Sequence, residues 1–443
     1  MIFIMNNQNQ KNWQAQVYER LANDDEGRVC KEISDEACQE TPGNFLATMV
    51  ANTCSSLADK LASAKTTLPW ILVQVGAPAW MLSFLVPIRE SGAMMPQLWI
   101  GAWVRQHRIR KWFWVTGGLI QGLCLLAMMV SVSLLEGALA GLTILGLLIV
   151  FSLARAVCSV AYKDVLGKTI PKTRRGRLSG WISAVAGLAS MSVGLWLSTK
   201  GQSNDIALYL GLLALAALFW FIAVVAYARI REFPGETAGG KDGWKAAVDN
   251  LTLLQRDRPF RRFVIARALA MGSGLAAPFY VSLASNDLGS TAGLLGLLIA
   301  VEGFAGLCSS PLWGRWADHL SRTVFAIACA IASLTTLAVA SLAVSGMTQQ
   351  MAFVVYPLAF FMLGVSHAGV RLGRKTYLVD MATGNQRTAY VAVSNTVIGF
   401  LLLVVGGVIA SVAAFSSVMA MVVLGVAGLA GSILGVQLRD VSA

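Results

Sequence analysis

The chain has 443 residues, of which 56% are hydrophobic and only 13% are charged, and its formal net charge is +12. This composition excludes an ordinary soluble protein, in which about 25% of the residues are charged. Apolar segments long enough to span a bilayer recur along the chain, so the sequence predicts an all-α integral membrane protein.

The amino-terminal segment, residues 1–49, is polar and contains an acidic cluster formed by Asp24, Asp25 and Glu26. The apolar start of the chain is too short for the hydrophobic region of a cleavable signal peptide. We therefore expect residues 1–49 to form a loosely ordered cytosolic tail.

The sequence then contains an internal repeat. The segment that begins at Gly76 resembles the one that begins at Gly289, about 213 residues further on, and the correspondence continues to Trp103 and Trp316. Paired bundles of apolar helices are typical of secondary transporters, which bind a solute between the two copies.

The repeat also decides where the first two membrane helices lie. The most apolar window, about 68–88, would leave only about 14 residues for a second span, which is too short for a membrane helix. Aligned with Gly289, Gly76 falls in a loop instead. This register predicts helix 1 at about 51–73 and helix 2 at about 80–103.

The remaining spans follow from hydropathy and loop charge. We expect helices 3 to 12 at about 112–132, 138–161, 178–198, 207–228, 262–284, 291–313, 324–345, 351–372, 389–410 and 414–436. The chain would then divide into the tail, a first six-helix bundle (50–229), a cytoplasmic central loop with an amphipathic helix (230–261), a second six-helix bundle (262–437) and a cytosolic C-terminus (438–443).

Basic residues gather in alternate loops. One such loop carries Arg105, Arg108, Arg110 and Lys111, whereas the intervening loops offer little beyond Lys200. The positive-inside rule predicts that the basic loops and both termini are cytoplasmic, in a bacterial inner membrane. Because this distribution accounts for the net charge, nucleic acid is not an expected partner.

The loop after predicted helix 8 carries Gly314, Asp318 and Arg322 at intervals of four residues. This spacing resembles the loop motif of the major facilitator superfamily, and a 6+6 repeat with a long basic central loop agrees with it over about residues 50–437. The segment from Leu82 to Gly92 resembles one found in a group of poorly characterised bacterial permeases of that superfamily. The resemblance implies twelve helices in two pseudo-repeated bundles, and it says little about the substrate.

The resemblance also implies a conformational lock, in which the motif Asp ties its loop to a helix of the opposite half. Asp318 would then meet the N-terminal end of helix 5, where the helix dipole favours a carboxylate. In the first copy Gly101 is present but Arg105 stands where the Asp should be. We therefore expect a different lock there, for instance through Asp380 near helix 11.

Charged side chains within the predicted spans are the site candidates, because each costs about 3 kcal/mol or more at the bilayer centre. The resemblance implies that helices 1, 4, 7 and 10 line a central cavity. The cavity candidates for substrate binding are Lys65, Arg89, Arg155, Arg267 and Arg371, and the candidates for proton coupling are Glu302, Glu90, Asp59 and His367. The basic excess favours an anionic or zwitterionic solute.

Most of these candidates have a structural alternative. Arg267 and Arg371 are close enough to the inner face to snorkel toward lipid headgroups. Arg89 could neutralise Glu90 or a neighbouring carboxylate, and His367 could be an ordinary buried histidine. Glu302 has only apolar neighbours on its own helix, and desolvation favours the neutral form of such a carboxyl group, so it is the first choice for proton coupling.

The sequence thus predicts a secondary active transporter that moves a small organic solute by alternating access, coupled to protons. The alternatives are an efflux pump for amphipathic toxic compounds, a transporter-like membrane sensor that signals through the tail, and a lipid flippase. No enzyme activity, cofactor or metal site is expected, because no phosphate-binding loop or metal-ligand spacing occurs. The expected partners are the solute, protons and the bilayer, and a monomer is the default.

Overall fold

A computed structural model describes residues 13–21, 35–200, 206–235, 237, 251–381 and 387–441. Within these ranges the chain is helical and contains no strand. Ten helices of the described part are long and apolar enough to cross a membrane. The first two spans of the chain complete a set of twelve, and each of these two is built from a pair of shorter helices.

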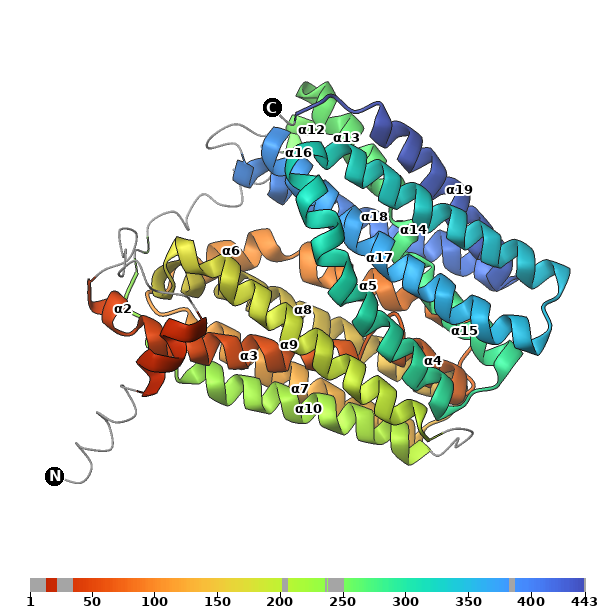
Figure 1. Cartoon of the computed structure of the whole chain (residues 1–443), viewed down its shortest axis with the longest axis horizontal. Helices are drawn as coiled ribbons and strands as arrows, with labels where there is room; N and C mark the ends of the chain where they lie inside the picture. Colours follow the sequence, from red (N-terminus) through yellow and green to blue (C-terminus); the bar gives the residue numbers. More distant parts are fainter. Residues whose placement is uncertain are drawn as a thin grey trace.

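The helices form two groups that lie side by side, the first drawn in red to yellow-green and the second in green to blue (Figure 1). The first group follows a short α2 (Asp35–Gln39) and consists of α3 (Thr41–Leu61), α4 (Thr67–Gln74), α5 (Leu82–Met94), α6 (Gln97–Arg105), α7 (Lys111–Leu134), α8 (Gly137–Thr169), α9 (Lys172–Ser198) and α10 (Ile206–Ala228). The second group consists of α12 (Leu253–Arg256), α13 (Arg258–Leu269), α14 (Gly272–Leu275), α15 (Ala277–Leu288), α16 (Ala292–Ser345), α17 (Gln349–Met381), α18 (Arg387–Ala413) and α19 (Ser417–Val436).

Spans 1, 2 and 7 are interrupted, and a proline follows each interruption. Pro69 lies in the first turn of α4, Pro96 directly precedes α6, and Pro278 lies in the first turn of α15. A proline has no N–H to donate and is best accommodated at the start of a helix, which suits it to the positions where these helices begin. The interruptions in spans 1 and 7 occupy similar places in the two copies of the repeat.

The backbone confirms the repeat and the register that it predicts. Gly76 and Gly289 both adopt positive φ angles, 72° and 87°, in the turns after spans 1 and 7. Gly137 and Gly346 do the same, at 60° and 81°, at the turns that lead into spans 4 and 10. Glycine enters this region without the steric cost of a side chain. The loop at Gly76 therefore separates helices 1 and 2, as the repeat indicated.

The two halves touch closely toward the end of the molecule that carries these first two turns. A Cβ atom on Gly194 of α9 would lie 2.4 Å from the backbone nitrogen of Ala300 in α16. A Cβ on Gly406 of α18 would lie 2.6 Å from a ring carbon of Pro87 in α5. Only glycine permits these approaches, so the halves are tightly closed here.

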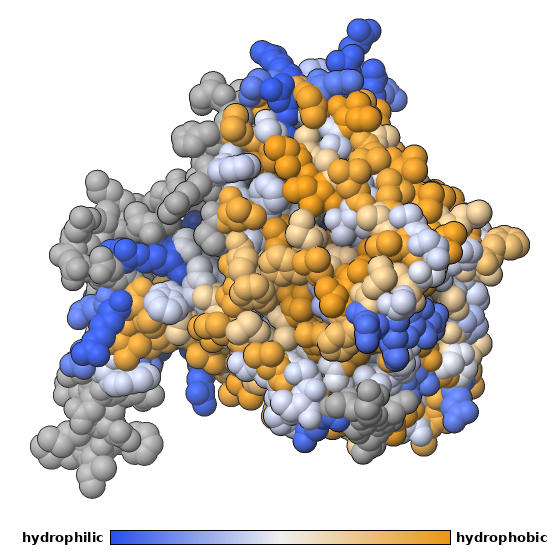
Figure 2. All heavy atoms as spheres, turned by 45° about the vertical axis from the view of Figure 1, so that its right-hand side comes forward, coloured by the Kyte–Doolittle hydropathy of each residue, from blue (hydrophilic) through white to orange (hydrophobic). Residues whose placement is uncertain are grey.

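Apolar side chains cover most of the face seen in Figure 2, and hydrophilic groups gather mainly at its margins. Large apolar side chains on the long helices are open to the surroundings, for example Leu134 and Val344, which are 75% and 76% exposed. A contiguous exposed apolar surface is unfavourable in water and suits the hydrocarbon of a bilayer. The fold is that of a multi-pass membrane protein.

Several element bounds differ from the sequence expectation. Helix α3 begins at Thr41, inside the segment assigned to the tail, and residues 13–21 form a helix that buries Tyr18 against Phe45. The motif loop after span 8 is helical, because α16 continues through it with a kink at Leu320. Most of the expected amphipathic helix of the central loop lies outside the described residues.

Candidate functional site

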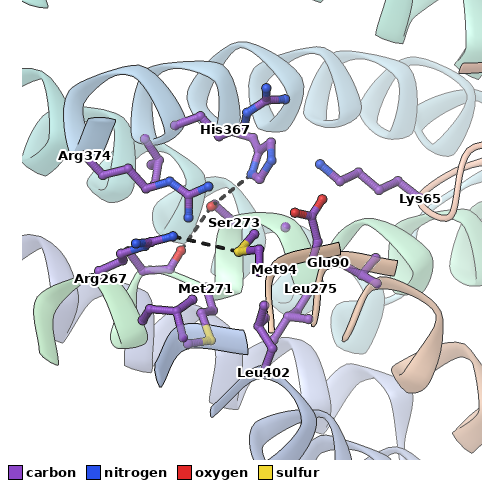
Figure 3. A pocket seen from close by; sticks show the side chains of 16 residues that line it. Lys65, Glu90, Met94, Arg267, Met271, Ser273, Leu275, His367, Arg374 and Leu402 are labelled. Atoms are coloured by element: carbon purple, nitrogen blue, oxygen red, sulfur yellow. Dashed lines mark hydrogen bonds between the residues drawn. The ribbon is translucent and has the colours of Figure 1, made fainter. Parts of the chain in front are cut away.

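A cavity lined by charged and apolar side chains lies between the two halves, where the interrupted spans 1 and 7 face α5, α17 and α18 (Figure 3). Its lining includes Lys65 from the interruption of span 1, Glu90 from α5 and Arg267 from α13. A second cavity adjoins the first, and the residues common to both are Lys65, Ser273, His367 and Arg371.

Arg267 is held in place by side chains from α18. Its terminal nitrogens donate to Ser394 Oγ at 2.6 Å and to Asn395 Oδ1 at 3.0 Å. Arg267 is only 5% exposed, which excludes the snorkelling alternative, because the guanidinium is directed into the bundle and away from headgroups. Its Nε is buried and has no hydrogen-bond partner among the described residues.

Helix α17 presents a basic face to the cavity. His367, Arg371 and Arg374 are spaced at i, i+4 and i+7, which places them on one helix face, and all three line the cavity. The sequence analysis missed Arg374 because the predicted helix ended at about residue 372, whereas α17 continues to Met381. The helical spacing from His367 onward was the signal that could have found it.

His367 has features of both roles considered from the sequence, an ordinary histidine held within the fold and a residue of the cavity. Its Nδ1 lies 3.3 Å from Ser273 Oγ, so it has a hydrogen-bond partner in the fold, and it also lines both cavities. Ser273 reaches the cavity from α14, a single turn between two interruptions of span 7.

Lys65 and Glu90 face the same space from the first half of the molecule (Figure 3). Neither side chain makes a hydrogen bond or an ion pair closer than 4.0 Å with another described residue. Their opposite charges are near enough to attract one another. Both groups therefore keep their hydrogen-bonding capacity for something that enters the cavity.

Glu302 joins the two halves. Its Oε2 accepts a hydrogen bond of 2.8 Å from the hydroxyl of Thr66, which lies in the interruption of span 1. The partner that its own helix cannot supply therefore comes from the opposite half. Glu302 lines the second cavity together with Lys60, and the two charges attract one another.

Asp59, Arg89 and Arg155 form a separate cluster within the first half. One oxygen of Asp59 lies 3.1 Å from Arg89, and the other lies 2.8 Å from Arg155. The guanidinium of Arg89 also lies over the ring of Phe151 at 5.1 Å, and that of Arg155 lies over Trp220 at 5.7 Å. None of the three lines either cavity, and Arg89 pairs with Asp59 rather than with its neighbour Glu90.

The structure places the lock candidates within α6 and near the kink of α16. Gly101 is buried in α6, and Arg105 is exposed at its end. Arg322 donates to the carbonyl of Leu438 at 2.9 Å and pairs with Asp440 at 3.2 Å, both in the segment after α19. The surroundings of Gly314 and the side chain of Asp318 lie outside the described part, so the lock between the halves stays a prediction.

A comparable set of contacts in the first half was not anticipated. The side chain of Glu232, after α10, is fully buried. It accepts hydrogen bonds of 2.8 and 2.7 Å from the backbone nitrogens of Arg110 and Lys111, and it pairs with Lys168 at 2.8 Å. A carboxylate at the N-terminal end of α7 satisfies free N–H groups and interacts favourably with the helix dipole.

The two adjoining cavities carry an excess of positive charge. Five basic side chains line them against two acidic ones, which leaves a net charge of +3 with His367 neutral: Lys60, Lys65, Arg267, Arg371 and Arg374 against Glu90 and Glu302. Such a site attracts anions, and a partly desolvated guanidinium binds carboxylates through strong charge-assisted hydrogen bonds.

No protein-family model and no curated protein sequence matches the chain. Solved transporter structures match nearly its whole length. A D-xylose–proton symporter has a TM-score of 0.69 at 13% identity, over 90% of this chain and 99% of the symporter. The nucleoside transporter NupG has a TM-score of 0.68 at 12% identity, over 89% and 100%. A POT family transporter in complex with 5-aminolevulinic acid has a TM-score of 0.66 at 11% identity, over 88% and 94%.

At these identities the likeness shows the fold. The chain has the major facilitator fold, with twelve membrane helices in two six-helix bundles, as the sequence resemblance predicted.

Proposed function

We propose that the protein is a secondary active transporter that moves a small anionic or zwitterionic organic solute by alternating access. The observation that carries the proposal is the net positive charge of the adjoining cavities at the interface of the two halves. Membrane transporters with paired bundles bind their solutes at such an interface. The similarity to solved transporter structures supports the same activity.

The proposed orientation places the basic loops and both termini in the cytoplasm of a bacterial cell, with the protein in the inner membrane. It rests on the positive-inside rule. The close contacts at Gly194 and Gly406 would then seal the outer side, so the cavities would exchange with the cytoplasm in this state. A cysteine introduced at Ala77, in a background without the native cysteines, should react with an impermeant thiol reagent from outside.

We assign proton coupling to Glu302 first. Its hydrogen bond from Thr66 crosses between the halves, and its charge faces Lys60. A proton on Glu302 would remove the charge at this contact and so change the relative stability of the two transport states. Asp59 is less suited to this role, because both oxygens of its carboxylate are paired with arginines of its own half, and it lines neither cavity.

The test uses the full chain in proteoliposomes. A pH gradient, acidic outside, should drive accumulation of at least one organic acid or amino acid from a charge-graded panel, and a protonophore should abolish it. Accumulation or extrusion of amphipathic cations alone would favour the efflux alternative. Binding without transport, together with an output lost on deletion of residues 1–40, would favour the sensor alternative.

A further inference from the structure

The cavity has two binding ends, and the first is formed by Arg267 and Arg374. The terminal nitrogens of Arg267 are occupied by Ser394 and Asn395, which fix the guanidinium, while its buried Nε remains without a partner among the described residues. Arg374 lines the same cavity and is close enough to Arg267 for their charges to repel. An oxyanion between them would relieve that repulsion and satisfy the free N–H.

The second end is formed by Lys65 together with Glu90. Lys65 comes from the interruption of span 1, and its ammonium group has no hydrogen-bonding partner among the described residues, although Glu90 is near enough to attract it. Arg267 and Arg374 belong to the second half of the molecule, whereas Lys65 belongs to the first. A ligand that contacts both ends therefore contacts both halves.

The size and charge of the space restrict the ligand further. The two adjoining cavities measure about 40 and 180 Å³, less than the several hundred Å³ of a typical drug-sized pocket. Their net charge of +3 is more than one negative charge can balance. A compact ligand with two separate acidic groups matches the excess better than a monoanion does.

We propose that the solute is a compact organic dianion of the dicarboxylate type. One carboxylate is held by Arg267 and Arg374, and the other is held by Lys65. This inference rests on the proposed transport function and names its substrate class. Inorganic phosphate shares the oxyanion chemistry, but its charge lies on a single group, so it offers no second acidic group to the other end.

Glu90 acts in this scheme as the internal counterion of Lys65. When the cavity is empty, its carboxylate offsets part of the positive charge, and the second carboxylate of the ligand replaces it at Lys65. Glu90 therefore competes with the dianion. Removing its charge should strengthen binding of a dicarboxylate more than binding of a monocarboxylate.

The binding test compares succinate with its monoamide, succinamate, which has the same length and one negative charge. Purified full-length protein should bind succinate about tenfold more tightly at neutral pH, because one charge-assisted hydrogen bond is added. Inorganic phosphate at the same concentration should bind more weakly than succinate. Equal affinity for succinate and succinamate, or tightest binding of phosphate, would overturn the proposal without any variant being needed.

Two substitutions test which residues form each binding end of the cavity. Lys65→Gln should bring the affinity for succinate down to that for succinamate and leave succinamate binding largely intact, whereas Arg267→Gln should weaken both. Glu90→Gln should increase the preference for succinate, and Asp440→Asn, which removes an acidic group outside both cavities, is the matched control that should not. A preference for succinate that survives Lys65→Gln in folded protein would contradict the assignment.

Transport separates this inference from the proposed function. If proteoliposomes accumulate monoanions or zwitterions and ignore succinate, the transport function stands and the dianion assignment fails. If succinate binds with the expected preference and no solute of the panel is moved, the assignment of the site stands and the transport function fails.

Discussion

Two groups of charged side chains lie inside the membrane part of this molecule, and they are built in opposite ways. In the cluster of Asp59, Arg89 and Arg155, each oxygen of the carboxylate faces its own guanidinium, and all three groups belong to the first half. In the cavity, the Nε of Arg267 has no hydrogen-bond partner among the described residues, and the surrounding groups come from both halves. In the first cluster every charged group has an ion-pair partner and the net charge is +1, whereas the cavities carry a net charge of +3.

The difference separates a structural use of buried charge from a binding use. Two cases must be distinguished for a charge in a low-dielectric region. In the first, other groups of the protein satisfy the charge; in the second, a partner is missing and the charge is unsatisfied. Asp59, Arg89 and Arg155 fit the first case and tie spans 1, 2 and 4 together. We interpret the cavity groups as the second case, in which the proposed ligand supplies the missing partner. The candidates predicted from the sequence for substrate binding and for proton coupling came from both sets.

The largest expected effect is on stability, from Asp59→Asn. This change leaves two guanidinium groups in the membrane without their carboxylate, and we expect a loss of about 3 kcal/mol in the free energy of unfolding. Thermal unfolding of the detergent-solubilised protein measures it. The double variant Asp59→Asn with Arg89→Gln should recover part of the loss. Normal stability combined with lost proton coupling would make Asp59 a functional group instead.

For Arg267→Gln we expect the opposite result, a loss of solute affinity without a loss of stability. Solute affinity should fall about tenfold to a hundredfold, because charge-assisted hydrogen bonds to the ligand are lost. The melting temperature of the empty protein should stay the same or rise, since a buried cation without a counterion is removed. Affinity and unfolding are measured on the same preparation. A large loss of stability with unchanged affinity would make Arg267 part of the structural framework.

Glu302→Gln should affect the energy coupling and leave binding intact. Accumulation driven by a pH gradient should disappear, while exchange of internal for external solute continues, because the amide keeps the shape and the hydrogen bond from Thr66 but cannot take up a proton. Glu302→Asp, which still titrates, is the matched control and should keep part of the accumulation. Full gradient-driven uptake by the Gln variant would exclude Glu302 and leave Glu90 and His367 as candidates.

The sequence predicted the fold from two kinds of information. Hydropathy supplied ten spans, and the repeat supplied the register of the first two, because Gly76 and Gly289 are both required to adopt positive φ. The pairing of charges could not be read in the same way. Arg89 and Glu90 are adjacent in the chain, but about 100° of rotation per residue sends one toward Asp59 and the other toward the cavity. Such partners depend on how helices pack, which no local pattern specifies.

The smallest expected effects concern two corresponding sets of contacts, which we call latches. One surrounds Glu232 in the first half and the other surrounds Asp440 in the second, at points that the repeat relates. Arg110 and Arg322 both precede the third helix of their half, and each contacts the segment after the last helix. In the first half the acceptor is the fully buried Glu232, so Glu232→Gln should cost about 1–2 kcal/mol in unfolding free energy.

In the second half the corresponding acid is Asp440, which is 56% exposed. Asp440→Asn should cost only about 0–1 kcal/mol, because solvent screens an exposed ion pair and the backbone contact from Arg322 to Leu438 remains. Thermal unfolding at low and high salt separates the two. The effect of Asp440→Asn should vanish at high salt, and most of the effect of Glu232→Gln should persist. Equal costs at both salt concentrations would show that burial does not distinguish the latches.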